Sequence, residues 1–160
     1  MDQAVQQAFA VETQTLAKKS WTAYIKIFVM MLVGISIASA IFRHAAGAGI
    51  LLFVLIALFC VYCFMEIRSV TLYYNDSGVW LYSGILPWNK GTQGVKWRDI
   101  ENAVFYPSMG SWLFKSYKLR IAHRFTRSSE IVLTNMRRGN EAVQTINNMH
   151  QNLIRDGAVK

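Results

Sequence analysis

An uncharged run over residues 45–65 constrains the fold of this chain more than any other feature. Its 21 residues include no proline and no amide side chain. As an α-helix the run would extend about 31 Å, at about 1.5 Å per residue. The hydrocarbon core of a bilayer is about 30 Å thick. The run therefore predicts a transmembrane helix.

A second apolar segment covers residues 21–42 and carries one charge, Lys26. That lysine lies near the N-terminal end of the segment, so its side chain can extend to the lipid headgroups. Only the short connection RHAAG, residues 43–47, lies between the two segments. We therefore expect a tight transmembrane hairpin over about residues 21–66, with both of its ends on one side of the membrane.

Neither a soluble helical core nor a signal peptide fits the apolar segments as well as a membrane hairpin does. In a soluble protein they would form a buried two-helix core, but the rest of the chain lacks the apolar surface to cover them. A cleaved signal peptide would begin closer to the N-terminus, whereas residues 1–20 are largely polar. We expect this N-terminal segment to be either a weakly amphipathic interfacial helix or an irregular polar lead-in.

The distribution of basic residues predicts the orientation of the hairpin. Lys18, Lys19 and Lys26 flank its N-terminal side, whereas the connection carries only Arg43. By the positive-inside rule, both termini are expected in the cytoplasm. Residues 67–160 contain 13 Lys or Arg and 6 Asp or Glu, a net charge of +7. An anionic cytoplasmic leaflet would attract such a domain.

The pattern after residue 66 changes to short β-type runs. Residues 69–84 read as two strands around the turn residues 75–78, and residues 116–123 and 130–135 read as a further hairpin. Apolar residues recur at helical spacing over 140–154. We therefore expect an α+β protein, in which a small β-barrel or curved sheet over 67–160 is capped by a C-terminal helix.

Two stretches after the hairpin carry a family resemblance. They are VTLYYNDSGVWLYSGILPW (70–88) and GVKWRDIENAVFYP (94–107). With the two preceding spans, the chain resembles the bacterial pleckstrin-homology-like (PH-like) membrane proteins over about residues 24–154. The resemblance implies a helix-capped PH-like barrel that binds lipids or proteins and often oligomerises. It also implies a multi-pass protein of the bacterial inner membrane, and it supplies no catalytic residue.

A basic set lies within 13 residues and is interleaved with aromatic residues; it consists of Lys115, Lys118, Arg120, Arg124 and Arg127. On a strand, Lys118 and Arg120 project from the face opposite Leu119. The set is a candidate site for anionic lipid headgroups or an acidic partner surface. The alternative is a solvated strand face. Nucleic acid is not an expected partner, because no helix-turn-helix, zinc or RNP-like pattern is present.

The stretch YPSMGSWLF (106–114) is an apolar loop with a glycine at its centre. If exposed, its side chains would form a patch suited to a protein partner or to the bilayer interface. Equally, the aromatic rings could fold into the domain core. The candidate interface residues are Met109, Trp112, Leu113 and Phe114.

Small residues in the apolar segments are candidates for helix packing; they are Gly34, Ser36, Ser39, Gly47 and Gly49. Such residues allow helices to approach closely, within the hairpin or between copies, although they are also common in transmembrane helices generally. Cys60 and Cys63 have C-x-x-C spacing. Because no second pair and no nearby histidine accompany them, we interpret them as packing residues.

The residue inventory does not predict an enzyme. No histidine is adjacent to a serine or cysteine, and no glycine-rich phosphate loop follows a strand. No cofactor or metal is expected. The sequence favours a membrane-anchored binding or assembly module for anionic lipids or membrane-bound proteins, through partner binding or self-association. The alternative is an accessory subunit of a larger inner-membrane complex for secretion, transport or conjugation.

Overall fold

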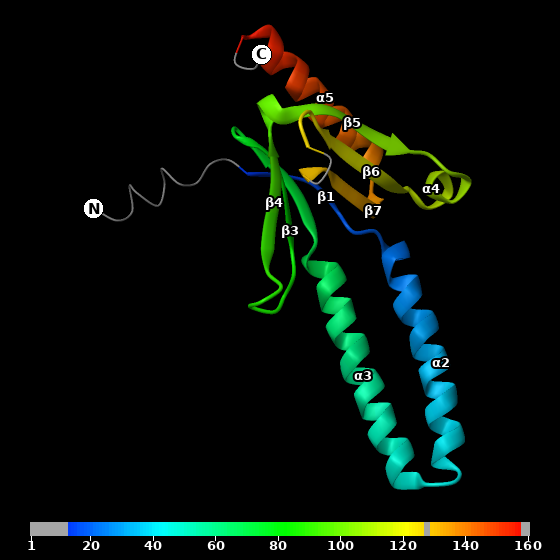
Figure 1. Ribbon diagram of the computed structural model, residues 1–160. Helices are drawn as coiled ribbons and strands as arrows, with labels where there is room; N and C mark the ends of the chain where they lie inside the picture. The colour runs from blue at the N-terminus through cyan, green and yellow to red at the C-terminus, as the bar shows by residue number, and fades with distance from the viewer. Residues whose placement is uncertain (1–12, 127–128, 158–160) are drawn as a thin grey trace.

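The computed structural model describes residues 13–126 and 129–157. Figure 1 shows two long helices that extend from one end of a compact α+β domain. In chain order, the elements are β1 (Gln14–Lys18), η1 (Trp21–Tyr24), α2 (Ile25–Phe42), α3 (Ala46–Ser69), β2 (Thr71–Asn75), β3 (Gly78–Ser83), β4 (Gly91–Lys96), η2 (Trp97–Asp99), β5 (Ile100–Tyr106), α4 (Met109–Phe114), β6 (Ser116–His123), β7 (Ile131–Arg137) and α5 (Gly139–Arg155).

Helices α2 and α3 form the expected antiparallel hairpin (Figure 1). Their connection is closed by hydrogen bonds from the amides of His44 and Ala45 to the carbonyl of Ile41, at 3.0 and 2.9 Å. The segments Trp21–Phe42 and Ala46–Ser69 are long and apolar enough to cross a membrane. Only 6% and 11% of their most apolar windows are buried within the structure. The helices therefore lack the burial that the core of a soluble protein would give them.

The first sheet has four antiparallel strands in the order β1-β2-β3-β4. Its edge strand β1 lies before the helical hairpin in the sequence, and Gln14 pairs with Tyr74 of β2. The β2–β3 turn forms at the predicted residues 75–78, where Asn75 Oδ1 accepts hydrogen bonds from the amides of Ser77 and Gly78. An asparagine that accepts from the amides that follow it is a common turn device.

The second sheet has three antiparallel strands in the order β5-β6-β7. The core lies between the two sheets and is closed by α5, whose Ala142, Val143 and Ile146 are buried. Asn147 fixes α5 to β5, because its amide group both accepts from and donates to the backbone of Ala103, at 3.2 and 3.0 Å. The apolar spacing that predicts this helix therefore corresponds to its buried face.

Residues 18–24 connect the two sheets to the first long helix. The amide of Ser20 donates to the carbonyl of Asn135 at 2.7 Å, and Lys19 forms an isolated bridge with Met136 of β7. The Nζ of Lys19 also donates to the carbonyl of Thr134 at 2.6 Å. The folded domain thus includes residues on both sides of the hairpin, and the expected boundary at residue 67 leaves out β1.

The α+β class, the two long apolar helices and the antiparallel sheets are confirmed. Within the described residues the two sheets do not close into a barrel, because no strand belongs to both. The strand β1 has no counterpart in the predictions for residues 1–20, and residues 1–12 lie outside the described part of the chain.

Candidate functional site

Three contacts define the end of the domain that joins the helices, which we call the hairpin end. The hydroxyls of Thr22 and Ser116 lie 2.6 Å apart. The rings of Trp21 and Phe114 pack edge to face. On the α3 side, the amide of Gly84 donates to Ser69 Oγ at 3.1 Å. Residues near these contacts therefore lie where the helices leave the domain.

Strand β6 begins at the hairpin end and carries two residues of the predicted basic set, Lys118 and Arg120. Leu119 is buried, whereas Lys118 projects from the opposite, exposed face, as the alternation of a strand requires. Lys118 Nζ lies 5.6 Å from the centre of the Tyr106 ring, within the range of a cation–π contact. Arg120 follows two residues later on the same face.

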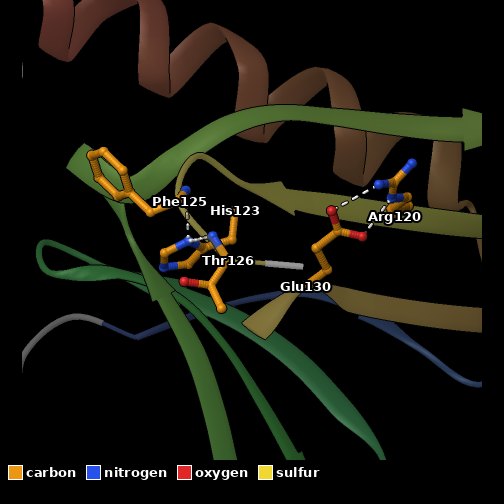
Figure 2. Close-up of polar contacts among 5 residues, drawn as sticks. All are labelled: Arg120, His123, Phe125, Thr126 and Glu130. Carbon is orange, nitrogen blue, oxygen red and sulfur yellow. Dashed lines mark hydrogen bonds and ion pairs between the residues drawn. The ribbon is translucent and has the colours of Figure 1, made fainter. Parts of the chain in front are cut away.

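Arg120 is paired with a carboxylate. Its Nε and Nη2 donate to the two carboxylate oxygens of Glu130, at 2.8 and 2.7 Å (Figure 2). These hydrogen bonds raise the pKa of the Arg120 guanidinium above its ordinary value. A bidentate pair of this kind holds the arginine in one orientation and neutralises its charge. Arg120 is therefore less suited to bind an external anion than the lysines of the set.

Arg124 lies past the far end of β6, and its amide donates to the carbonyl of Asp99 at 2.8 Å. In the same turn, His123 Nδ1 accepts from the amides of Phe125 and Thr126, both at 3.2 Å (Figure 2). Burial lowers the pKa of His150, and the nearby charge of Arg124 lowers it further. The structure thus separates Arg124 from Lys115, and Arg127 lies outside the described residues.

Two further arginines join the lysines at the hairpin end. Arg137 pairs with Ser116 across β6 and β7, and the amide of Arg138 donates to the carbonyl of Lys115 at 3.0 Å. Both Lys115, just before β6, and Arg138, just after β7, adopt left-handed backbone conformations, with φ of 48° and 50°. We call Lys115, Lys118, Arg137 and Arg138 the basic cluster.

The charges of the basic cluster are largely uncompensated. In the described ranges, no carboxylate lies within ion-pair distance of Lys115, Lys118 or Arg137. Among the same residues, Arg138 has one carboxylate contact, a long one of 3.8 Å to the exposed Glu141. Sequence reasoning missed Arg137 and Arg138, although the adjacent pair in MRRGN, just before the C-terminal helix, is a visible signal. The cluster can attract phosphate or carboxylate groups.

The predicted apolar loop contains the short helix α4. Ser108 and Ser111 form a reciprocal capping box at its start, and Ser111 is buried against the domain. Met109, Trp112 and Leu113 are 90%, 74% and 65% exposed, and Phe114 is less exposed because it contacts Trp21. The exposed side chains of α4 therefore leave the core and lie next to the start of the first long helix.

The predicted packing residues of the hairpin occupy different environments. A Cβ on Gly34 would lie 2.9 Å from Ile56, and one on Gly49 would lie 2.6 Å from the Cα of Phe42. A Cβ on Gly47 would meet no atom within 4 Å. The hydroxyls of Ser36 and Ser39 donate to carbonyls of their own helix, those of Leu32 and Ser36. Of the three glycines, Gly34 and Gly49 thus closely face the other helix, whereas Gly47 does not.

The two cysteines of the C-x-x-C pattern are free thiols in α3. Cys60 is buried and lines a groove of about 360 Å³ with Tyr24 and Phe64, so it contributes to packing of the hairpin. Among residues 13–126 and 129–157, no three side chains of the His, Cys, Asp or Glu type are placed to hold a metal ion.

Comparison with protein-family models, with curated proteins and with solved structures found no match to this chain. The PH-like resemblance therefore stays a prediction. The geometry of the hairpin end, with its cations and exposed aromatic side chains, supplies the basis for a functional proposal.

Proposed function

We propose that this chain is a membrane-anchored, non-enzymatic module that binds anionic lipid headgroups at the membrane that its hairpin crosses. In this proposal α2 and α3 span the bacterial inner membrane, both termini lie in the cytoplasm, and the α+β domain is a PH-like module. The apolar outer surface of the hairpin supports the spanning role, since large apolar side chains of both helices are exposed along their length. In water such a surface would be strongly unfavourable.

The position of the basic cluster is the observation that carries the proposal. Lys115 and Arg137 flank Ser116, whose hydroxyl touches Thr22 one residue after Trp21. The uncompensated cations therefore lie at the level where the first helix would enter the lipid. Each basic residue near an anionic surface contributes about 1 kcal/mol of attraction. Arg120, which is neutralised by Glu130, contributes little to this attraction.

A lipid-preference measurement tests the proposal. The full chain is purified in mild detergent and exposed to equal amounts of phosphatidylglycerol and phosphatidylcholine, and the bound lipids are counted by native mass spectrometry. We expect the wild type to retain phosphatidylglycerol preferentially, and Lys115→Gln/Arg137→Gln to lose most of this preference. Equal retention of both lipids by the wild type would overturn the proposal.

Arg155→Gln, which removes one cation where the test variant removes two, is the control for a cation far from the hairpin end. Arg155 carries the same charge, but it lies in the last turn of α5, whereas Arg138 lies just before the first. The 17 residues of α5 separate the two ends by about 25 Å. We expect this variant to keep the lipid preference of the wild type, because that distance exceeds the screening length of about 8 Å at physiological salt.

A second candidate function is that of an accessory subunit in a larger inner-membrane complex. A groove of about 500 Å³ on the hairpin favours this function, because the small residues Ala38, Ser39 and Gly49 are part of its lining, together with larger side chains. Small side chains allow another transmembrane helix to approach closely. Stoichiometric recovery of a second membrane protein with the detergent-solubilised chain would support this function. Recovery of the chain with lipid alone would contradict it.

A further inference from the structure

We infer that α4 and the β3–β4 loop both insert into the interfacial layer of the bilayer, one on each side of the hairpin. The domain would then rest on the membrane at three points, the hairpin and these two segments, in a single orientation. This inference rests on the proposed membrane anchoring, and it adds a second binding surface, which is apolar and recognises the lipid interface itself.

The β3–β4 loop presents an exposed tryptophan that belongs neither to the basic cluster nor to α4. Trp88 is 81% exposed, in the β3–β4 loop over residues 84–90. On the other side of the domain, α4 exposes Trp112 beside Met109. Tryptophan is enriched at membrane–water interfaces, where its ring contacts the lipid and its N–H stays near the headgroups.

Both segments lie at the hairpin end of the domain. Asn89, next to Trp88, donates from its side-chain amide to Glu66 Oε1 of α3 at 3.3 Å. Phe114, at the end of α4, packs against Trp21 at the start of the first helix. Figure 1 shows the β3–β4 loop beside the upper end of α3, and α4 above the upper end of α2 and to its right. A membrane that contains the two helices would thus meet both segments.

The backbone of each segment is held in a defined shape. The amides of Asn89 and Lys90 both donate to the carbonyl of Leu86 at 2.9 Å. Gly84, with φ of 96°, allows the loop to close, because a Cβ there would lie 2.0 Å from the carbonyl oxygen of Asn89. In α4 the capping box satisfies the amides of Ser108 and Ser111. Such internal hydrogen bonds reduce the cost of placing backbone near lipid.

The bilayer interface fits these segments better than a protein partner does. Each exposed tryptophan has a lysine close behind it in sequence, Lys90 after Trp88 and Lys115 after Trp112. An aromatic ring backed by a cation matches a layer of apolar chains beneath anionic headgroups. The two segments also flank the same pair of apolar helices, so their surfaces continue the lipid-facing surface of the hairpin.

Quenching of tryptophan fluorescence by lipid tests the inference. All variants carry Trp21→Phe and keep Trp80 and Trp97, whose indoles donate to Asn75 within the first sheet. In this background the chain is prepared with both Trp88 and Trp112, with either one replaced by Phe, and with both replaced. Each variant is reconstituted in nanodiscs of ordinary or brominated phosphatidylcholine. The variant without Trp88 and Trp112 measures the signal of the core.

We expect brominated lipid to remove most of the emission that Trp88 and Trp112 each add, and to leave the core signal nearly unchanged. Quenching of the added emission by aqueous iodide but not by brominated lipid would place the segments in water and overturn the inference. Protection from both quenchers would indicate a protein that covers them, a partner or a second copy, and would also overturn it.

Alkaline carbonate extraction of native membranes separates this result from a failure of the anchoring proposal. A chain that stays in the membrane pellet but shows no lipid quenching would support the anchoring proposal and overturn the inference of interfacial insertion. A chain that carbonate releases would contradict the anchor, and the insertion with it.

Discussion

The rings of Trp21 and Phe114 pack edge to face, with centroids 5.2 Å apart and planes 87° apart. This contact joins the start of the first long helix to the end of α4, although 92 residues separate the two positions in the sequence. Edge-to-face packing is a favourable aromatic geometry. The contact therefore fixes the exposed side chains of α4 relative to the start of the hairpin.

Replacing Phe114 with alanine should loosen α4. The lost aromatic contact is worth about 0.5–1.5 kcal/mol beyond its buried area, so we expect faster hydrogen exchange of the α4 amides and little change in the amides of β6. Hydrogen exchange with mass spectrometry of the full chain in nanodiscs measures this. Phe125→Ala is the control, because Phe125 is exposed in the β6–β7 connection, away from α4. Unchanged exchange of α4 in Phe114→Ala would contradict a role for the contact.

Adding a single methyl group to Gly49 should destabilise the hairpin. The new Cβ would lie 2.6 Å from Phe42 Cα, a backbone atom that cannot move aside without separating the helices. Overpacking of this kind costs about 1–3 kcal/mol. Gly47→Ala is a matched control in the same helix, because no atom lies within 4 Å of its added Cβ. Unfolding by SDS titration in mixed micelles should show a lower stability for Gly49→Ala only; equal midpoints would contradict the packing.

Asn75 should be essential to the stability of the first sheet. Its Oδ1 accepts from the amides of Ser77 and Gly78 and from the indole of Trp80 at 2.9 Å. Asn75→Ala leaves these donors without that acceptor, and we expect the free energy of unfolding of the domain to fall by about 1–3 kcal/mol. Asn75→Asp keeps an acceptor and should restore most of the loss. Denaturant unfolding followed by tryptophan emission measures both; equal loss in the two variants would contradict this role.

The stability of the domain should decrease as the pH falls below about 6.5. His150 is buried, and its Nε2 has no hydrogen-bond partner among the described residues. Burial lowers the pKa of His150, and Arg124 lowers it further, whereas a hydrogen bond with the Trp97 backbone opposes them. The unfolded chain therefore binds a proton at a higher pH than the folded chain does. The neutral His150 ring therefore contributes its full share of the folding stability above the pKa of histidine in the unfolded chain. This share is lost as the pH falls through the lower pKa of His150 in the folded chain.

Thermal unfolding in detergent at about pH 7.5 and pH 5.5, on either side of the ordinary histidine pKa, checks this prediction. The wild type should have the lower midpoint at the acidic pH, and His150→Gln should remove most of the difference. His44→Gln, which changes an exposed histidine in the hairpin connection, should behave like the wild type. An equal pH dependence in wild type and His150→Gln would show that other groups cause the effect.

The hairpin, the β2–β3 turn and α5 could be predicted because each follows from local sequence. An uncharged run, a cluster of turn residues and an apolar spacing suffice for these elements. Strand β1 could not be predicted, because QTLAK has weak strand character and forms only by pairing with β2, which lies beyond the whole hairpin. Helix α4 depends on the Ser108–Ser111 capping box. The sequence did not predict a helix here, because glycine in the first turn has a low helix propensity.

The candidate site was predictable only in part, because it depends on contacts between distant residues. Arg120 belongs to a basic run in the sequence, but Glu130, across the β6–β7 connection, neutralises it. Arg137 and Arg138 join Lys115 because β6 and β7 pair, which brings the residue just before β6 next to the residues at the end of β7. Trp88 reaches the hairpin end because the β3–β4 loop folds back toward Glu66.

Cysteine accessibility tests most directly the proposal that the hairpin crosses the membrane. In a Cys60→Ala/Cys63→Ala background, one cysteine is introduced at Ala45 in the hairpin connection or at Asp156 after α5. A membrane-impermeant maleimide is then applied to right-side-out spheroplasts and to inside-out vesicles. We predict that Ala45→Cys reacts only from the outer side and Asp156→Cys only from the cytoplasmic side. Reaction of both cysteines from the same side would contradict a hairpin that crosses the membrane.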